Sequence, residues 1–431
     1  MHMRNNRRSF LKAGLGAGLL PLGYHSAVAA PPTRSPNEKL HIGAIGVWTR
    51  ARDNITACAN EQIVALADVD AGFLSRMHAL YPKTKTYVDF RKLLEQRDLD
   101  AVVISTPDHT HFHAARQAMQ SGLHVYCEKP LAHSVREVES LVRTAAACQV
   151  VTQHGNQHHA SQGYRQAVAI LQAETIGKIQ AVHSWTARPI WPQGIERPPA
   201  APKPNHLDWD LWLGPAPARP YAQGYHTIHW RGFWDFGTGA LGDMGPHLLD
   251  PVFTALQLQT PRTIQVESAP VSAESAPEWS IVRFEFSHAQ HARQPLTVTW
   301  YDGGKRPSAE AIGVRRPPPH GTMLIGERGR LFIPQLGKKP IVLMDDKSTP
   351  KIDVEPGLDH HRDWIAACKA NTTPRFPFSK AEPIVTTCLL GNIALRIGTQ
   401  LQWNAQKKAF DDNAMANALL DRRYRQGWES A

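Results

Sequence analysis

Cysteine is scarce in this chain of 431 residues. The five cysteines are odd in number and scattered, without the short paired spacings typical of zinc ligands. We therefore expect no disulfide framework and no bound metal. We interpret all five as buried thiols: Cys58, Cys127, Cys148, Cys368 and Cys388.

Long apolar runs and basic clusters are also missing. No segment after residue 30 reaches the roughly 18 apolar residues that a membrane-spanning helix needs, so we expect no stable membrane span. The formal net charge is +10, but no block of lysine and arginine is interleaved with aromatic residues. We interpret the charge as a solvated basic surface and exclude nucleic acid as a partner. The apolar content of 42% in a chain this long predicts two domains.

Residues 1–30 have the order of a twin-arginine export signal. Arg7-Arg8-Ser9-Phe10-Leu11-Lys12 precedes a Gly-rich apolar run, and the small residues Ala27-Val28-Ala29 follow it. Asn6 stands where such signals usually carry Ser or Thr. We predict export by the twin-arginine machinery, cleavage and a periplasmic location. A basic tail without a signal function is the alternative. A Pro-rich linker, residues 31–39, follows.

Residues 40–156 alternate short apolar runs with helical patterns, as is typical of a doubly wound parallel sheet. This α/β segment is the first predicted domain. The predicted strands cover 41–45, 63–67, 101–105, 124–126 and 150–153, and the predicted helices cover 90–96, 112–121 and 135–147.

Residues 157–431 have a different pattern, which predicts an α+β domain with an open, mostly antiparallel sheet. A Trp/Pro-rich insertion, 188–236, is too long for an ordinary loop, and long ordered loops usually carry function. Residues 380–431 form a closing helix and tail. The predicted strands are 179–186, 263–267, 280–286, 296–301, 322–325 and 330–333, and the predicted helices are 161–173, 243–258, 361–370 and 381–401.

The first strand is followed by an incomplete dinucleotide-binding fingerprint. Gly46 opens the turn, and Asp68 ends the second strand at the distance expected for a ribose ligand. Trp48 and Ala51 replace the second and third glycines of the fingerprint. We predict that Gly46, Trp48 and Asp68 bind the cofactor in a Rossmann-type nucleotide site, with an ordinary strand–turn–helix connection as the alternative. Asp68 without an adjacent arginine favours NAD over NADP.

Two further motifs follow predicted strands, at the sheet edge where open α/β sheets bind ligands. They are Ser105-Thr-Pro-Asp-His-Thr-His111 and Glu128-Lys129-Pro130, and the pair resembles the Gfo/Idh/MocA oxidoreductase family. The resemblance implies that Lys129 lies between cofactor and substrate. For His109 alone, a helix-capping role is the alternative. The resemblance implies that the nicotinamide pocket includes Thr106, Pro107, His109, His111, Glu128 and Lys129.

Asp243 and His247 are four residues apart and share one face if they lie on a helix. We expect that helix to begin near Asp243, with Pro246 in its first turn and a kink at Pro251. A carboxylate that orients an imidazole can shuttle protons near neutral pH, and the spacing resembles the Asp-x-x-x-His element of the same family. We predict Lys129, Asp243 and His247 as the catalytic residues. A capping aspartate and a structural histidine are the alternative.

The insertion suits a carbohydrate site, because tryptophan faces stack on sugar rings while polar side chains bind hydroxyls. An aromatic mini-core or a subunit contact is the alternative. The predicted substrate-binding residues are Gln157, His158, Trp191, Trp230, Arg231 and Trp234.

The resemblance implies an enzyme that transfers hydride between a sugar, polyol or glycoside hydroxyl and tightly bound NAD, with NADP less favoured. Two alternatives stay open. One is a redox-neutral, NAD-dependent glycosidase that oxidises its sugar transiently, and the other is a sugar-binding relative without a cofactor. We also expect a homo-oligomer.

Overall fold

The computed structural model describes residues 38–335, 337–348, 354 and 356–429. The predicted export signal and most of the predicted linker lie outside the described residues.

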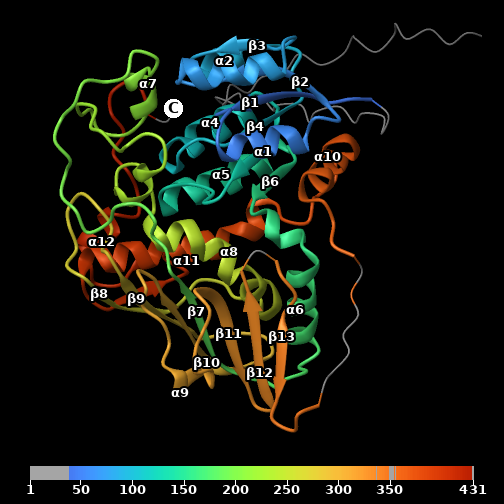
Figure 1. Cartoon of the computed structure of the whole chain (residues 1–431), viewed down its shortest axis with the longest axis vertical. Helices are drawn as coiled ribbons and strands as arrows, with labels where there is room; N and C mark the ends of the chain where they lie inside the picture. Colours follow the sequence, from blue (N-terminus) through green and yellow to red (C-terminus); the bar gives the residue numbers. More distant parts are fainter. Residues whose placement is uncertain (1–37, 336, 349–353, 355, 430–431) are drawn as a thin grey trace, which may run out of the picture.

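The N-terminal half contains a six-stranded parallel sheet, which confirms the predicted doubly wound fold (Figure 1). The strand order is β3-β2-β1-β4-β5-β6. The edge strand β3 was not predicted because it is short and mostly exposed. The strands are β1 (His41–Ile45), β2 (Gln62–Ala67), β3 (Lys85–Tyr87), β4 (Ala101–Ile104), β5 (His124–Glu128) and β6 (Thr152–Gly155).

Five helices connect these strands, and polar caps fix where several of them begin. Asp70 caps α2 through two backbone N–H groups, and Ser134 with Glu137 forms a capping box on α5. The predicted helix 112–121 begins four residues earlier, because its first turn buries polar residues that break the apolar pattern. The helices are α1 (Arg50–Ala57), α2 (Ala71–Leu80), α3 (Phe90–Leu94), α4 (Asp108–Gln120) and α5 (Val135–Cys148).

The C-terminal half contains a nine-stranded sheet that is antiparallel except for the β7–β10 pair, which confirms the predicted open sheet. The strand order is β13-β12-β11-β7-β10-β9-β8-β14-β15. Its strands are β7 (Ile179–Thr186), β8 (Thr263–Ser268), β9 (Ser280–Phe286), β10 (Ala292–Tyr301), β11 (His320–Gly326), β12 (Gly329–Pro334), β13 (Ile341–Met344), β14 (Leu401–Asn404) and β15 (Ala409–Phe410).

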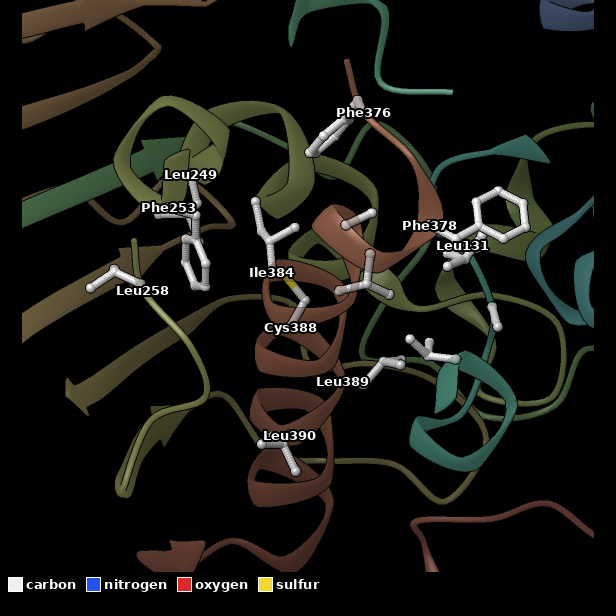
Figure 2. Packing of buried hydrophobic residues seen from close by; sticks show 14 of the residues in the cluster. Leu131, Leu249, Phe253, Leu258, Phe376, Phe378, Ile384, Cys388, Leu389 and Leu390 are labelled. Atoms are coloured by element: carbon white, nitrogen blue, oxygen red, sulfur yellow. The ribbon is translucent and has the colours of Figure 1, made fainter. Parts of the chain in front are cut away.

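Two long helices, α8 (Gly239–Leu256) and α11 (Phe378–Ile397), lie between the two sheets (Figure 1). A Cβ on Gly245 of α8 would come within 2.6 Å of the Cys388 Sγ on α11, so a glycine allows the two helices to pack closely. Figure 2 shows Ile384 and Cys388 on the side of α11 that faces Phe253 of α8. This packing places α8 beneath the first sheet.

The helix α8 begins at Gly239, four residues before the predicted start. Pro246 therefore lies in the helix interior rather than in the first turn, and Pro251 is also inside the helix. The expectation about the first turn was wrong, because the Gly-rich residues before Asp243 are already helical.

The chain returns to the N-terminal half near its end. Helix α10 (His360–Ala370) places the fully buried Trp364 against Ile42, Val103 and Tyr126 of the first sheet. In the C-terminal tail, the Tyr424 hydroxyl donates to Glu137 of α5. Residues from the end of the sequence thus complete the core of the first domain.

The insertion 188–236 folds around a buried aromatic cluster. Trp209 stacks on Trp212, with ring centroids 4.8 Å apart, and Tyr225 packs edge-on to Phe236. Most of its aromatic residues therefore form the mini-core that the sequence left open as an alternative. The short helices are α7 (Trp209–Leu213) and η2 (His229–Gly232) in the insertion, with η1 (Gln157–Ala160), α6 (Gln162–Gln172), α9 (Ala309–Ile312) and α12 (Ala414–Ala418) elsewhere.

The five cysteines are all buried and free, as predicted. Among the described residues, no helix combines the length and the apolar character needed to cross a membrane.

Candidate active site

A cavity of about 340 Å³ lies between the carboxyl edge of the first sheet and helix α8. Its lining runs from Gly46 and Asp68 at one end to Lys129, Asp243 and His247 at the other. The predicted nucleotide and catalytic residues therefore share one continuous space. Thr106, Pro107 and Glu128 also line it.

The end near Gly46 fits a dinucleotide. Gly46 has a φ of +76°, and a Cβ there would lie 2.7 Å from the Ser105 carbonyl oxygen, so only glycine suits this position. The backbone N–H groups of Trp48 and Thr49 donate to no other described residue. Unpaired N–H groups at the start of a helix attract phosphate oxygens.

Asp68 is fixed by two backbone donors. The N–H of Val47 donates to its Oδ2 and the N–H of Asp70 to its Oδ1, each at 2.9 Å. Burial raises the pKa of Asp68 to about 6, although these hydrogen bonds oppose the rise. The carboxylate is thus mostly ionised at pH 7 and lines the nucleotide end of the cavity.

Trp48 lines the cavity without closing it. Its indole stacks on Phe73 of α2, with ring centroids 5.9 Å apart and planes inclined by 18°. The guanidinium groups of Arg52 and Arg76 lie 5.7 and 5.6 Å from the same ring. The indole is held against α2, and the cavity continues past it to Gly46 and Asp68.

A buried polar network supports the middle of the cavity. Asn54 Nδ2 donates to Glu128 Oε1 at 2.8 Å, and Arg50 Nε donates to the same oxygen at 3.1 Å. The Asn54 Oδ1 lies 3.1 Å from Nε2 of His361 on α10. Sequence reasoning missed Arg50, Asn54 and His361, because their partners are far away along the chain and carry no local signal.

The catalytic end is organised around Asp243. Lys129 Nζ lies 2.6 Å from Asp243 Oδ1 and 2.8 Å from the Asp243 carbonyl oxygen, and Arg231 Nε lies 3.4 Å from Oδ1. Burial alone would raise the pKa of Asp243, but the charges of Lys129 and Arg231 hold it well below its ordinary value. Asp243 is therefore a permanent anion that fixes the Lys129 side chain.

The protonation state of His247 follows from its neighbour Asn156. Asn156 Nδ2 donates to the Pro246 carbonyl at 2.7 Å and to Asp250 Oδ2 at 3.0 Å, which leaves Oδ1 facing His247 Nδ1 at 2.5 Å. Because an amide oxygen only accepts, Nδ1 carries the proton and Nε2 keeps a lone pair. Burial, together with the charge of Lys129, lowers the pKa of His247 well below its usual value.

Asp250 continues this chain of hydrogen bonds away from the cavity. Its Oδ1 lies 2.9 Å from His159 Nδ1 and accepts from Thr254 Oγ1 at 3.0 Å. The His159 ring stacks on Phe376, with centroids 4.0 Å apart. Sequence reasoning missed Asn156, although its position just after β6, at the carboxyl edge of the sheet, was a usable signal.

Four of the six predicted substrate residues line the catalytic end: Gln157, His158, Trp230 and Arg231. Trp191 and Trp234 do not line it. Their indole N–H groups donate to Gln193 Oε1 and the Ser272 carbonyl, and both rings are buried. Arg188 and Gln335 line the cavity but were not predicted as site residues.

His109 and His111 do not line the cavity either, because backbone carbonyls surround both rings. The His109 nitrogens lie 3.2 and 3.0 Å from the carbonyl oxygens of Phe236 and Trp212. Those of His111 lie 2.8 and 2.9 Å from the carbonyl oxygens of Pro130 and Thr106. Both histidines support the walls of the site. Within the described residues, no group of His, Cys, Asp and Glu is arranged to hold a metal.

Family comparisons match both halves of the chain. Residues 40–156 match a family described as "Oxidoreductase family, NAD-binding Rossmann fold", and residues 174–292 match one described as "Oxidoreductase family, C-terminal alpha/beta domain". Together the two matches span more than half of the chain.

Curated relatives match over shorter stretches. A glycosyl hydrolase family 109 protein of Solibacter usitatus is 34% identical over an alignment of 166 residues, gaps included, that covers 34% of this chain and 37% of that protein. An inositol 2-dehydrogenase of Rhodococcus erythropolis is 26% identical over 167 residues, 38% of this chain and 48% of that protein. The chain thus matches less than half the length of these relatives.

Solved structures share the fold over most of the chain. The WlbA dehydrogenase of Bordetella pertussis, in complex with NADH and UDP-GlcNAcA, has a TM-score of 0.62 at 15% identity and covers 85% of this chain and 99% of its own. GenD2 from gentamicin A biosynthesis, in complex with NAD, has a TM-score of 0.59 at 16% identity and covers 88% of this chain and 100% of its own.

Proposed function

Because the chain belongs to the Gfo/Idh/MocA family of oxidoreductases, we propose that it is an exported enzyme that transfers hydride between a carbohydrate hydroxyl and NAD. The observation that carries this proposal is the single cavity that joins Gly46 and Asp68 to Lys129, Asp243 and His247. Relatives named as inositol dehydrogenases support a sugar, polyol or glycoside as the substrate.

In this proposal, a bound nicotinamide supplies the hydride acceptor. His247 Nε2 accepts the proton of the substrate hydroxyl, because Asn156 holds the ring proton at Nδ1. The Lys129 ammonium donates to the same hydroxyl oxygen and stabilises the negative charge that develops on it. Asp243 orients Lys129 through the 2.6 Å ion pair.

Asp68 favours NAD over NADP in this site. Its carboxylate is held by the N–H groups of Val47 and Asp70 at the end of β2, where a ribose hydroxyl would be bound. A 2′-phosphate would bring a second negative charge next to that carboxylate. We therefore expect a preference for NAD.

A redox-neutral glycosidase is the second candidate, because several relatives are named as glycosyl hydrolase family 109 proteins. A sugar-binding protein without a cofactor is less well supported, since Gly46 and the free N–H groups behind it fit phosphates.

The test begins with natively purified protein, from which denaturation should release NAD. The protein is then incubated with a panel of glycosides and polyols without added NAD. We expect substrate oxidation to stop after one equivalent per protein molecule, and the absorbance of bound NADH to appear. Sustained release of free sugar without any acceptor would favour the glycosidase instead. Absence of NAD and NADP, both after denaturation and in calorimetric titration, would favour the cofactor-less sugar-binding protein.

Lys129→Met should lower turnover by at least about 100-fold while the released NAD stays unchanged, because the ammonium acts on the reacting oxygen. A matched control is Lys369→Met. Lys369 is similarly buried and pairs with Glu61 at 2.8 Å, but it does not line the cavity. Equal turnover in the two variants would refute the role of Lys129.

Export and assembly are part of the same proposal, which includes passage through the twin-arginine machinery to the periplasm and a homo-oligomer. Exchanging Arg7 and Arg8 for Lys should retain the protein in the cytoplasm, because the arginine pair is the part of the signal that the receptor reads. Equal periplasmic amounts of both forms in cell fractionation would exclude this route.

A further inference from the structure

Arg188 is a cation of the cavity for which the described part of the chain provides no carboxylate partner. The residue follows β7, and its half-buried side chain lines the same cavity as Lys129 and His247. Among the described residues, no ion pair and no side-chain hydrogen bond of Arg188 is found. Its guanidinium carbon lies 5.9 Å from the centroid of the Trp191 ring.

The Trp191 ring links Arg188 to the catalytic end. The guanidinium carbon of Arg231 lies 5.8 Å from the same ring, and Arg231 Nε lies 3.4 Å from Asp243. Both arginines therefore contact one indole, and one of them reaches the carboxylate that binds Lys129. This places Arg188 at the reacting end, away from the phosphate-binding turn at Gly46.

The acids that line the cavity already have partners. Glu128 pairs with Arg50, and Asp243 pairs with Lys129 and Arg231. Asp108 accepts from the Thr238 hydroxyl at 2.8 Å, and Asp68 accepts two backbone N–H groups. The positive charge of Arg188 is thus left for a ligand.

We propose that the substrate is an anionic sugar, whose carboxylate, sulfate or phosphate group binds Arg188 beside Trp191. This inference rests on the proposed function, because it concerns the substrate of the same site. A guanidinium that lines a cavity and contacts an aromatic ring is suited to such a group, since it presents several N–H donors in a rigid plane.

The experiment measures the affinity of the protein, with its cofactor bound, for matched sugars by calorimetry. The pairs are glucuronate and glucose, and galacturonate and galactose. Glucose 6-sulfate and glucose 6-phosphate distinguish the type of anion. We expect at least one anionic sugar to bind at least about tenfold more tightly than its neutral partner, as a charge-assisted hydrogen bond provides.

Variants of Arg188 test whether this residue causes the preference for anionic sugars. In Arg188→Gln, the affinities for the charged and the neutral sugar should differ by no more than about twofold. Arg188→Lys should keep part of the preference for the charged sugar, and NAD occupancy should stay unchanged in both variants. Arg97→Gln, at an exposed position outside the cavity, is the control and should bind like the wild type. Equal affinities for the charged and neutral sugars in the wild type, or a preference that survives in Arg188→Gln, would overturn the proposal.

The two proposals fail separately. Anionic preference in a protein that holds no nicotinamide would support the Arg188 site and refute the oxidoreductase. Hydride transfer from neutral sugars, with no preference for their charged partners, would refute the Arg188 site alone.

Discussion

Asn156 shows how one amide can decide the direction of a proton transfer. Its Nδ2 donates to the Pro246 carbonyl and to Asp250, so Oδ1 is the atom that accepts from His247 Nδ1. The opposite ring nitrogen then accepts a proton and does not donate one. We regard Asn156 as a positioning residue, because it acts through His247 and does not line the cavity.

Asn156→Ala should lower kcat by about 10- to 100-fold with little change in KM, because the ring loses its fixed tautomer. Asn156→Asp should instead shift the acid limb of the rate profile to higher pH, because a carboxylate next to His247 raises its pKa. A merely structural role would not move that limb. The measurements are pH–rate profiles and nitrogen NMR of the imidazole.

Asn417→Ala is the control for this pair. The Asn417 side chain likewise joins two parts of the chain, through hydrogen bonds with the backbone N–H and C=O of Phe410, but it lies outside the cavity. This variant should lose stability and keep its rate. An unchanged kcat and pH profile in both Asn156 variants would contradict the positioning role.

Residue types alone predicted the site only where the chemistry is local. Lys129, Asp243 and His247 line one cavity, and the sequence singled them out because their motifs are short and follow strands or share a helix face; their catalytic roles stay a prediction. The resemblance implies a cofactor contact for His109, but both of its ring nitrogens lie within hydrogen-bond distance of backbone carbonyl oxygens. Nothing in a sequence distinguishes a histidine satisfied by distant backbone from one that faces a ligand.

At the level of elements, the turn between β1 and α1 depends on Gly46. Gly46→Ala should abolish NAD retention. An alanine in the left-handed conformation alone costs about 1–2 kcal/mol, and the free energy of unfolding should fall by more than this, because the added Cβ would clash with Ser105. Gly398→Ala is the matched control. Gly398 has a nearly equal φ of +77°, and a Cβ added there would have no other atom within 4 Å. Chemical unfolding and NAD release measure both effects.

Equal losses of stability in these two variants would show that the clash at Gly46 is relieved by local movement. Retained NAD in Gly46→Ala would contradict the assignment of this turn to the phosphates.

Elements were predicted well where one pattern dominates. The strands β1, β4 and β5 are almost wholly buried and carry apolar residues at their centres, and the sequence located all three. The edge strands β13 and β15 were missed, because β15 has only two residues and β13 is a run of only four whose side chains are partly exposed. The start of α8 was misplaced, because glycine and proline disfavour helices in isolation and tertiary packing against α11 overrides this preference.

For the whole molecule, buried histidines predict a loss of stability in acid. Burial lowers the pKa of His109 to about 3 and those of His113, His124 and His360 to about 4. In the unfolded chain each has a pKa near 6.5, so below that pH the unfolded state binds more protons. Stability should therefore fall as the pH drops from 6.5 to about 4.

Five buried or half-buried carboxyl groups with a raised pKa oppose this trend: Asp68, Asp108, Glu137, Asp302 and Glu382. Burial raises the pKa of Asp68 and of Asp302 to about 6, so the folded state takes up their protons first and gains stability as the pH falls toward 4. Each group contributes about 1.4 kcal/mol per pH unit between its two pKa values, and the histidines with a lowered pKa outnumber the acids with a raised one. Denaturant unfolding between pH 7.5 and 4.5 should show the net decrease, and a constant free energy of unfolding would contradict it.

The contact of α10 with the first sheet also sets an order of events during synthesis. Tyr126 and Val103 leave the ribosome long before Trp364, the residue that covers them. At about 5–20 residues per second, the interval lasts roughly 10–50 s. During that time the newborn N-terminal half lacks the residue that buries these apolar side chains in the folded protein, so the first domain reaches its final packing only after the second has been synthesised.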